Sequence, residues 1–170
     1  EAMRQQLANA LQADWAWAFD AHQDNGAYQP DPVSSGRRAL AGMALAYLCL
    51  AARDSGDPVW PGKTYQRFKT ASNMTDRFNA LNALVGSAHA HAEPALARFH
   101  ALFKDEALVL DKWFALQAGA TDRGGNILPA VKQLLKHPDF TLRNPNRARS
   151  VVFSYCSANP GAFHRADAAG

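Results

Sequence analysis

Three arginines lie around the start of one predicted helix. The segment that holds Arg143, Arg147 and Arg149 reads TLRNPNRARS over residues 141–150. Asn144 followed by Pro145 predicts that the helix begins here, because an Asn side chain accepts hydrogen bonds from first-turn amides and proline fits the first helical position. The positive end of the helix dipole disfavours cations by about 0.3–1 kcal/mol and favours anions. The arginines therefore need acidic neighbours, an acidic partner surface or an anionic ligand.

A second group with possible chemistry is His89, His91 and Glu93. Two histidines at alternate positions of a helix end point to different sides, whereas a helical pair of metal ligands needs one face, as in His-Glu-x-x-His. We interpret this segment as a polar loop and expect no metal site in the chain. No Ser/His/Asp or Cys/His arrangement follows from spacing, so we predict no catalytic residue.

The remaining polar candidates are predicted to be structural. Asp111 and Lys112 lie beside Trp113 and are expected to form a solvated pair next to a core tryptophan. A role in gripping another domain is the alternative for this pair. Asn144 and Asn146 are interpreted as caps and loop ties rather than as ligands.

Composition excludes several classes of protein. The chain has 170 residues, of which 48% are hydrophobic and 19% charged, so it can bury a core without disulfides and is not disordered. Its net charge of +3 is small, and no long Lys/Arg stripe argues for nucleic acid. No apolar run approaches the roughly 20 residues that a membrane span needs. Cys49 and Cys156 form no Cys-x-x-Cys pair and are expected to be reduced core thiols, which favours a cytoplasmic location.

Apolar residues recur at helical spacing along the chain, and no segment alternates as a strand does. Helices are predicted over residues 3–22, 36–53, 63–71 and 144–158, with four more built on Phe78–Ala88, Leu96–Phe103, Val109–Gln117 and Ile127–Leu135. Residues 28–36 and 56–62 are expected to be connectors, because both are rich in proline, glycine and serine or aspartate. Asn73 and Asp76 have the spacing of a capping box.

About eight helices joined by short connectors must pack antiparallel to their neighbours in sequence. We therefore predict an all-α fold, an α-solenoid of antiparallel helix pairs like armadillo or HEAT superhelices, although no clean internal repeat is visible. Residues 1–170 are expected to form a single helical domain. Residues 163–170 resemble the approach to a further helix. A solenoid cut there would expose an apolar face, so we interpret the chain as a fragment.

Four blocks occur in a fixed order along the chain: NMTD (73–76), LVLDKWF (108–114), FTLRNPNRARS (140–150) and SANPGAFH (157–164). Their series resembles the C-terminal helical domain of bacterial aminopeptidase N, in the M1 family of zinc metallopeptidases. The similarity runs from about Ser35 to Gly170.

The resemblance implies a non-catalytic domain that caps the catalytic chamber of a zinc aminopeptidase and controls which peptides enter. The family's His-Glu-x-x-His zinc motif, its downstream Glu ligand and its Gly-x-Met-Glu-Asn motif belong to the catalytic domain, and none is present here. The implied zinc therefore belongs to the parent enzyme, and the fragment alone is expected to be inactive. The implied partners are the catalytic domain of the same polypeptide and peptide substrates. The chain is expected to be the N-terminal and central part of the family's solenoid, without its final helices.

The resemblance also implies a role for Arg149. In the family the second arginine of the Asn-Pro-Asn-Arg-x-Arg block points toward the channel that leads to the zinc, and a guanidinium suits a peptide carboxylate because it can bind it bidentately. Positions 147 and 149 are about 200° apart on a helix, so the two arginines flank opposite sides of a predicted core stripe of Ala148, Val152 and Tyr155. The alternative for Arg149 is a salt bridge within or between domains. Arg143 and Arg147 are predicted to be structural.

A different class of function stays open, namely an independent helical-repeat scaffold that binds a partner protein through a concave face. The reading frame upstream of Glu1 distinguishes the two. A His-Glu-x-x-His motif there supports the aminopeptidase, and a start codon near Glu1 supports the scaffold.

Overall fold

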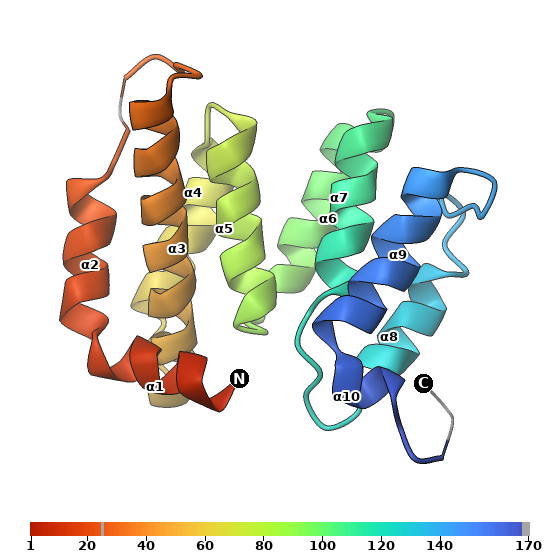
Figure 1. Ribbon diagram of the computed structural model, residues 1–170. Coiled ribbons are helices and arrows are strands. Elements are labelled where there is room, and N and C mark those ends of the chain that lie inside the picture. The colour runs from red at the N-terminus through yellow and green to blue at the C-terminus, as the bar shows by residue number, and fades with distance from the viewer. Residues whose placement is uncertain (25, 168–170) are drawn as a thin grey trace. The chain divides into compact units, whose positions relative to one another are not determined.

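The computed structural model describes residues 1–24 and 26–167, and this part of the chain contains ten α-helices and no strand (Figure 1). The helices are α1 (Ala2–Ala10), α2 (Gln12–Ala21), α3 (Pro32–Ser55), α4 (Val59–Thr70), α5 (Met74–Gly86), α6 (Ala92–Phe103), α7 (Ala107–Ala118), α8 (Ile127–Leu134), α9 (Pro145–Ala158) and α10 (Pro160–Phe163). The chain divides into two compact units, Glu1–Ala95 and Leu96–Gly170. Among the described residues, no helix combines the length and the apolar character that crossing a bilayer requires.

Helix α3 is the centre of the first unit, and α1, α2, α4 and α5 all pack against it. It begins at Asp31, whose carboxylate accepts hydrogen bonds from the amides of Val33 (2.9 Å) and Ser34 (3.0 Å), and Pro32 occupies the first turn. It ends at Gly56, where a φ of 71° suits glycine. The predicted start at Gly36 is therefore wrong. Asp31-Pro32 is the same start signal as Asn144-Pro145, and it lies inside the predicted connector.

The predicted helix over residues 3–22 is in fact two helices, because the backbone turns at Leu11. Neighbouring residues of α3 hold the two pieces. The Gln5 amide donates to the carbonyl of Leu50 (2.8 Å), whereas Trp15 in α2 stacks on Tyr47 with ring centroids 4.4 Å apart. No glycine or proline marks this break in the sequence. Tertiary contacts of this kind decide where the helix ends and override local periodicity.

Helix α4 begins four residues earlier than predicted. The side chain of Asp57 accepts the amide of Val59 at 2.9 Å, and Pro61 fits within the first turn, where its missing N–H is not needed. Helix α5 begins at Asn73 as the capping-box spacing predicts, and the Asn73 side chain accepts from the amide of Asp76 (2.9 Å). The Asp76 carboxylate also pairs with Arg67 of α4 at 3.1 Å.

A charged residue, Arg38, lies on the buried side of α3 with 2% of its surface exposed. Its guanidinium pairs with Asp24, donates to the carbonyl of Gln29 (2.6 Å) and packs under the ring of Tyr28. These contacts tie the α2–α3 connector to the core. The sequence analysis missed this role because a single arginine in an apolar stripe has no spacing signal.

In the second unit α7 packs against both α8 and α9, and α9 packs against α10. Helices α7 and α9 run parallel. Arg147, near the start of α9, pairs with Asp111 in the first half of α7, and a side-chain carbon at Gly119 would lie 3.8 Å from Ser154 and Ala158 near the end of α9. In a helical solenoid every second helix runs in the same direction, and the helix between them runs in the opposite direction.

The two cysteines are free thiols in different surroundings. Burial raises the pKa of Cys49 to about 11, and its Sγ lies 3.1 Å from the Thr64 hydroxyl, whereas Cys156 is half-buried. At pH 8 a pKa near 11 leaves roughly one thiol in a thousand ionised. We predict that a thiol reagent such as DTNB labels Cys156 in the native chain and labels both cysteines in denaturant. A Cys156→Ser variant should lose native labelling, and rapid labelling of Cys49 in that variant would contradict the buried position.

Candidate functional site

The arginine segment forms the N-terminal end of α9. The Asn144 side chain caps the helix by accepting from the amides of Asn146 (3.0 Å) and Arg147 (3.3 Å), and Pro145 is the first helical residue. The Thr141 hydroxyl accepts the amide of Arg143 at 3.2 Å, which fixes the approach to the helix. The start of α9 therefore lies where the Asn-Pro pair predicts it.

Arg147 points into the second unit. Its Nε pairs with the carboxylate of Asp111, its Nη1 donates to the carbonyl of Asp139, and its guanidinium lies over the ring of Phe114, 5.1 Å from the centroid. The side chains of Arg147 and Asp111 are only 7% and 13% exposed. This cation is therefore neutralised inside the unit, and it joins α9 to α7 and to the turn after α8.

Two expectations about this region are wrong. Asp111 is not a solvated partner of Lys112, because it faces Arg147 from α7. The core stripe of α9 runs through Arg147, Val151 and Tyr155, which are buried, and not through Ala148 and Val152. The buried stripe differs from the predicted one because hydrophobic periodicity does not place an arginine in a core. An arginine whose charge is paired can nevertheless occupy a buried position.

Arg149 lies on the other side of α9 and is exposed, and so is Arg143. Neither guanidinium has a hydrogen bond or an ion pair within residues 1–24 and 26–167. The salt bridge that is the alternative for Arg149 therefore has no partner in the described part of this chain. Whether Arg149 faces a substrate channel stays a prediction.

Large apolar side chains lie next to Arg149 on the exposed face of α9. Val152 is 48% exposed and Phe153 is 68% exposed, three and four positions after Arg149 and thus on the same side of the helix. We call Arg149, Val152 and Phe153 the α9 outer face. A positive charge beside adjacent exposed apolar side chains suits a partner that is both apolar and anionic.

The segment with His89, His91 and Glu93 spans the turn before α6 and its first residues. The amide of His91 donates to Nδ1 of His89 (3.1 Å), and the His91 ring stacks on Tyr65 with centroids 4.6 Å apart. Burial, and secondarily the charge of His91, lowers the pKa of His89. Among the described residues, these side chains belong to no group of three metal-ligand atoms. Such a group does form from His100, His137 and Asp139, which sequence spacing could not bring together.

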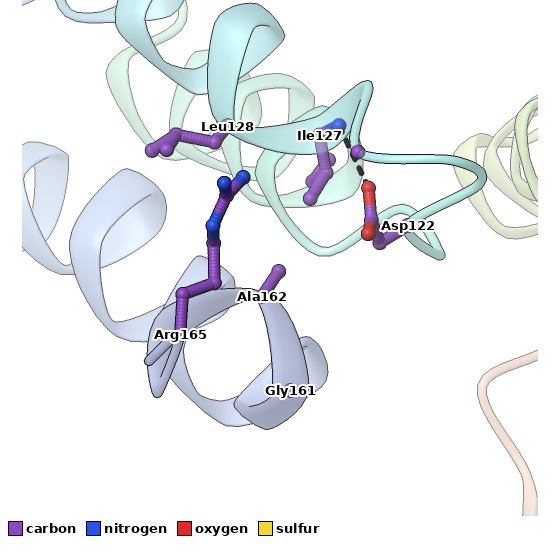
Figure 2. A pocket seen from close by; sticks show the side chains of 7 residues that line it. Asp122, Ile127, Leu128, Gly161, Ala162 and Arg165 are labelled. Atoms are coloured by element: carbon purple, nitrogen blue, oxygen red, sulfur yellow. Dashed lines mark hydrogen bonds between the residues drawn. The ribbon is translucent and has the colours of Figure 1, made fainter. Parts of the chain in front are cut away.

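A pocket of about 210 Å³ opens between the loop before α8 and α10 (Figure 2). Its lining consists of Asp122, Gly125, Ile127, Leu128, Gly161, Ala162 and Arg165. Both charged groups are engaged, since Asp122 accepts the amide of Ile127 (3.0 Å) and Arg165 pairs with Asp167 (2.6 Å). Asn159 holds the loop before α8 by accepting the amide of Asp122 (2.8 Å) and donating to the carbonyl of Ala120 (2.9 Å). The pocket contains no predicted site residue, and its charges are used for local structure.

Comparison with known proteins agrees with a helical-repeat architecture. Residues 1–170 match the family described as a domain of unknown function (DUF3458_C) with ARM repeats. The predicted all-α, armadillo-like solenoid class is thereby confirmed. The chain belongs to this DUF3458_C family.

The relatives are aminopeptidases. The chain is 37% identical to aminopeptidase N of Caulobacter vibrioides over 150 residues, which cover 87% of this chain and 16% of that protein. It is 31% identical to aminopeptidase N of Escherichia coli K12 over its whole length, which covers 19% of that protein. A crystal structure of Legionella pneumophila aminopeptidase A in complex with aspartic acid is similar with a TM-score of 0.78 and 27% identity, over 96% of this chain and 19% of that one. The resemblance to the helical domain of aminopeptidase N is confirmed, and the chain spans less than a fifth of each of these relatives.

Proposed function

We propose that this chain is a non-catalytic helical domain of a zinc aminopeptidase of the M1 type, which releases N-terminal amino acids from peptides. The observation that carries the proposal is the match of the entire chain to aminopeptidase N. The low coverage of that relative favours a part of a larger enzyme over the independent scaffold. The domain would be the N-terminal and central part of the relative's helical repeat.

The catalytic zinc does not fit this chain. The sequence has no His-Glu-x-x-His motif. In its His89-x-His91-x-Glu93 segment, Nδ1 of His89 accepts the amide of His91 within a turn. The partner that supplies the metal is then the catalytic domain of the same polypeptide. We derive no step of peptide hydrolysis from residues of this chain.

The role proposed for the domain is to form part of the wall of the catalytic chamber and to control access of peptides. The α9 outer face supports this role. Arg149 is an exposed guanidinium without a partner among the described residues, and it can bind the C-terminal carboxylate of a peptide bidentately. Val152 and Phe153 offer adjacent apolar surface to a peptide side chain or to the facing domain.

Arg147 supports the same role indirectly. Its contacts to Asp111 and to the Asp139 carbonyl fix how α9 lies on α7. They therefore fix the direction in which Arg149 projects.

We also propose a cytoplasmic location, which the two free thiols support.

The isolated chain tests the non-catalytic assignment. We predict that residues 1–170, purified without the rest of the enzyme, release no amino acid from aminoacyl chromogenic amides, whereas the full-length protein does. Added zinc should not produce turnover by the isolated chain, because the chain has no His-Glu-x-x-His motif to hold a catalytic zinc beside a general base. Turnover that copurifies with the isolated chain would contradict the proposal.

A further inference from the structure

Three potential metal ligands converge in the second unit, away from the α9 outer face. His100 lies on α6, and His137 and Asp139 lie in the turn between α8 and α9. One ligand atom from each lies within 4.8 Å of the other two. Nε2 of His100 is 2.7 Å from Oδ2 of Asp139, and Nδ1 of His137 is 3.8 Å from the same oxygen.

These distances are close to those of a tetrahedral site. With metal–ligand bonds of about 2.0–2.1 Å, neighbouring ligand atoms lie about 3.3 Å apart. The 2.7 Å contact between His100 and Asp139 is a hydrogen bond, which a bound ion would replace. The other pairs lie at 3.8 Å and within 4.8 Å, so the side chains would move toward one another to reach one ion. Two imidazole nitrogens and one carboxylate oxygen favour zinc and its neighbours in the transition series over magnesium or calcium, which prefer oxygen ligands.

The groups around these side chains hold them in place. The Trp113 ring packs against His100 and His137, with centroids 4.9 and 5.3 Å away, and Phe114 contacts His137 edge-on. The carbonyl of Asp139 accepts from Arg147, whose charge is balanced by Asp111. Such outer contacts orient metal ligands and commonly change metal affinity by about ten- to a hundredfold.

Nδ1 of His137 already has a partner within the same turn. It accepts the amide of Asp139 at 3.1 Å. A bound ion would replace the Asp139 amide at Nδ1.

We propose that His100, His137 and Asp139 bind one divalent ion of the zinc class, with the fourth position open to water. The proposal differs from the expectation from sequence that the chain binds no metal. A bound ion would join the end of α6 to the turn before α9.

The test uses the tag-free 170-residue chain after treatment with a chelator. Titration with Co²⁺, followed by visible absorption, and with Zn²⁺, followed by calorimetry, should show one saturable site, and Mg²⁺ should show none. His100→Ala and Asp139→Asn should each weaken binding more than about tenfold. The matched control is His89→Ala with His91→Ala, which removes the other close histidine pair and should leave binding unchanged.

Far-UV circular dichroism must show that each variant is folded. Tryptophan fluorescence gives a second readout, because a paramagnetic ion bound at His100 and His137 should quench the part of the signal that comes from Trp113, one of the four tryptophans. The proposal is overturned if the chain binds no Zn²⁺ or Co²⁺ at millimolar concentration. It is equally overturned if binding survives Asp139→Asn and His100→Ala, or if the control pair abolishes it.

Discussion

Replacing Arg147 by methionine should lower the free energy of unfolding of this chain by about 3–5 kcal/mol. The substitution leaves the Asp111 carboxylate, 13% exposed, without its partner, and it removes the donor to the Asp139 carbonyl. An unpaired charge in a buried site is costly because neither water nor a counter-charge stabilises it. The loss can be measured by urea unfolding followed by circular dichroism.

Arg149→Met is the matched control, since it is the same substitution on the same helix at an exposed position. It should change stability by no more than about 0.5 kcal/mol. The double variant Arg147→Met with Asp111→Leu should recover a large part of the loss, because it removes both charges together. Equal costs for Arg147→Met and Arg149→Met would show that the buried pair does not hold α9 in place.

The start of a helix that has a side-chain cap can be predicted from the sequence, because the capping residue marks it. Asn144-Pro145 and Asn73 place the starts of α9 and α5 correctly, because capping is local chemistry within four residues. Asp31-Pro32 carries the same information and was overlooked in a connector rich in turn residues. The turn at Leu11 could not be predicted, because contacts with α3 from distant residues decide it.

The candidate site was predicted only in part. Helical geometry alone separated Arg147 from Arg149, and the structure places them on opposite sides of α9. It did not reveal which one is buried, because the partner that makes burial possible, Asp111, lies 36 positions away in sequence. The His100–His137–Asp139 group was missed for the same reason. Spacing motifs detect ligands on one helix, whereas these come from a helix and a distant turn.

The buried pair and the exposed arginine together give the proposed function a physical basis. The charge of Arg147 is paired with Asp111 inside the second unit, so Arg147 is not available to bind a ligand. Arg149 keeps its charge at the surface, next to Val152 and Phe153. A helix that is fixed by Arg147 thus presents Arg149 at the surface, and the proposed role in substrate access needs such an exposed arginine.

The most direct test is Arg149→Ala in the full-length protein that we propose to be an aminopeptidase. We expect KM for tripeptides with a free C-terminal carboxylate to rise by about tenfold or more, because a charge-assisted hydrogen bond of about 1.5–3 kcal/mol is lost. KM for single aminoacyl amides, which have no carboxylate, should change less than about twofold. Arg143→Ala, the exposed arginine before the helix, should change neither value. If Arg149→Ala affected both kinds of substrate equally, Arg149 would be a structural salt-bridge residue and its proposed role in substrate access would be wrong.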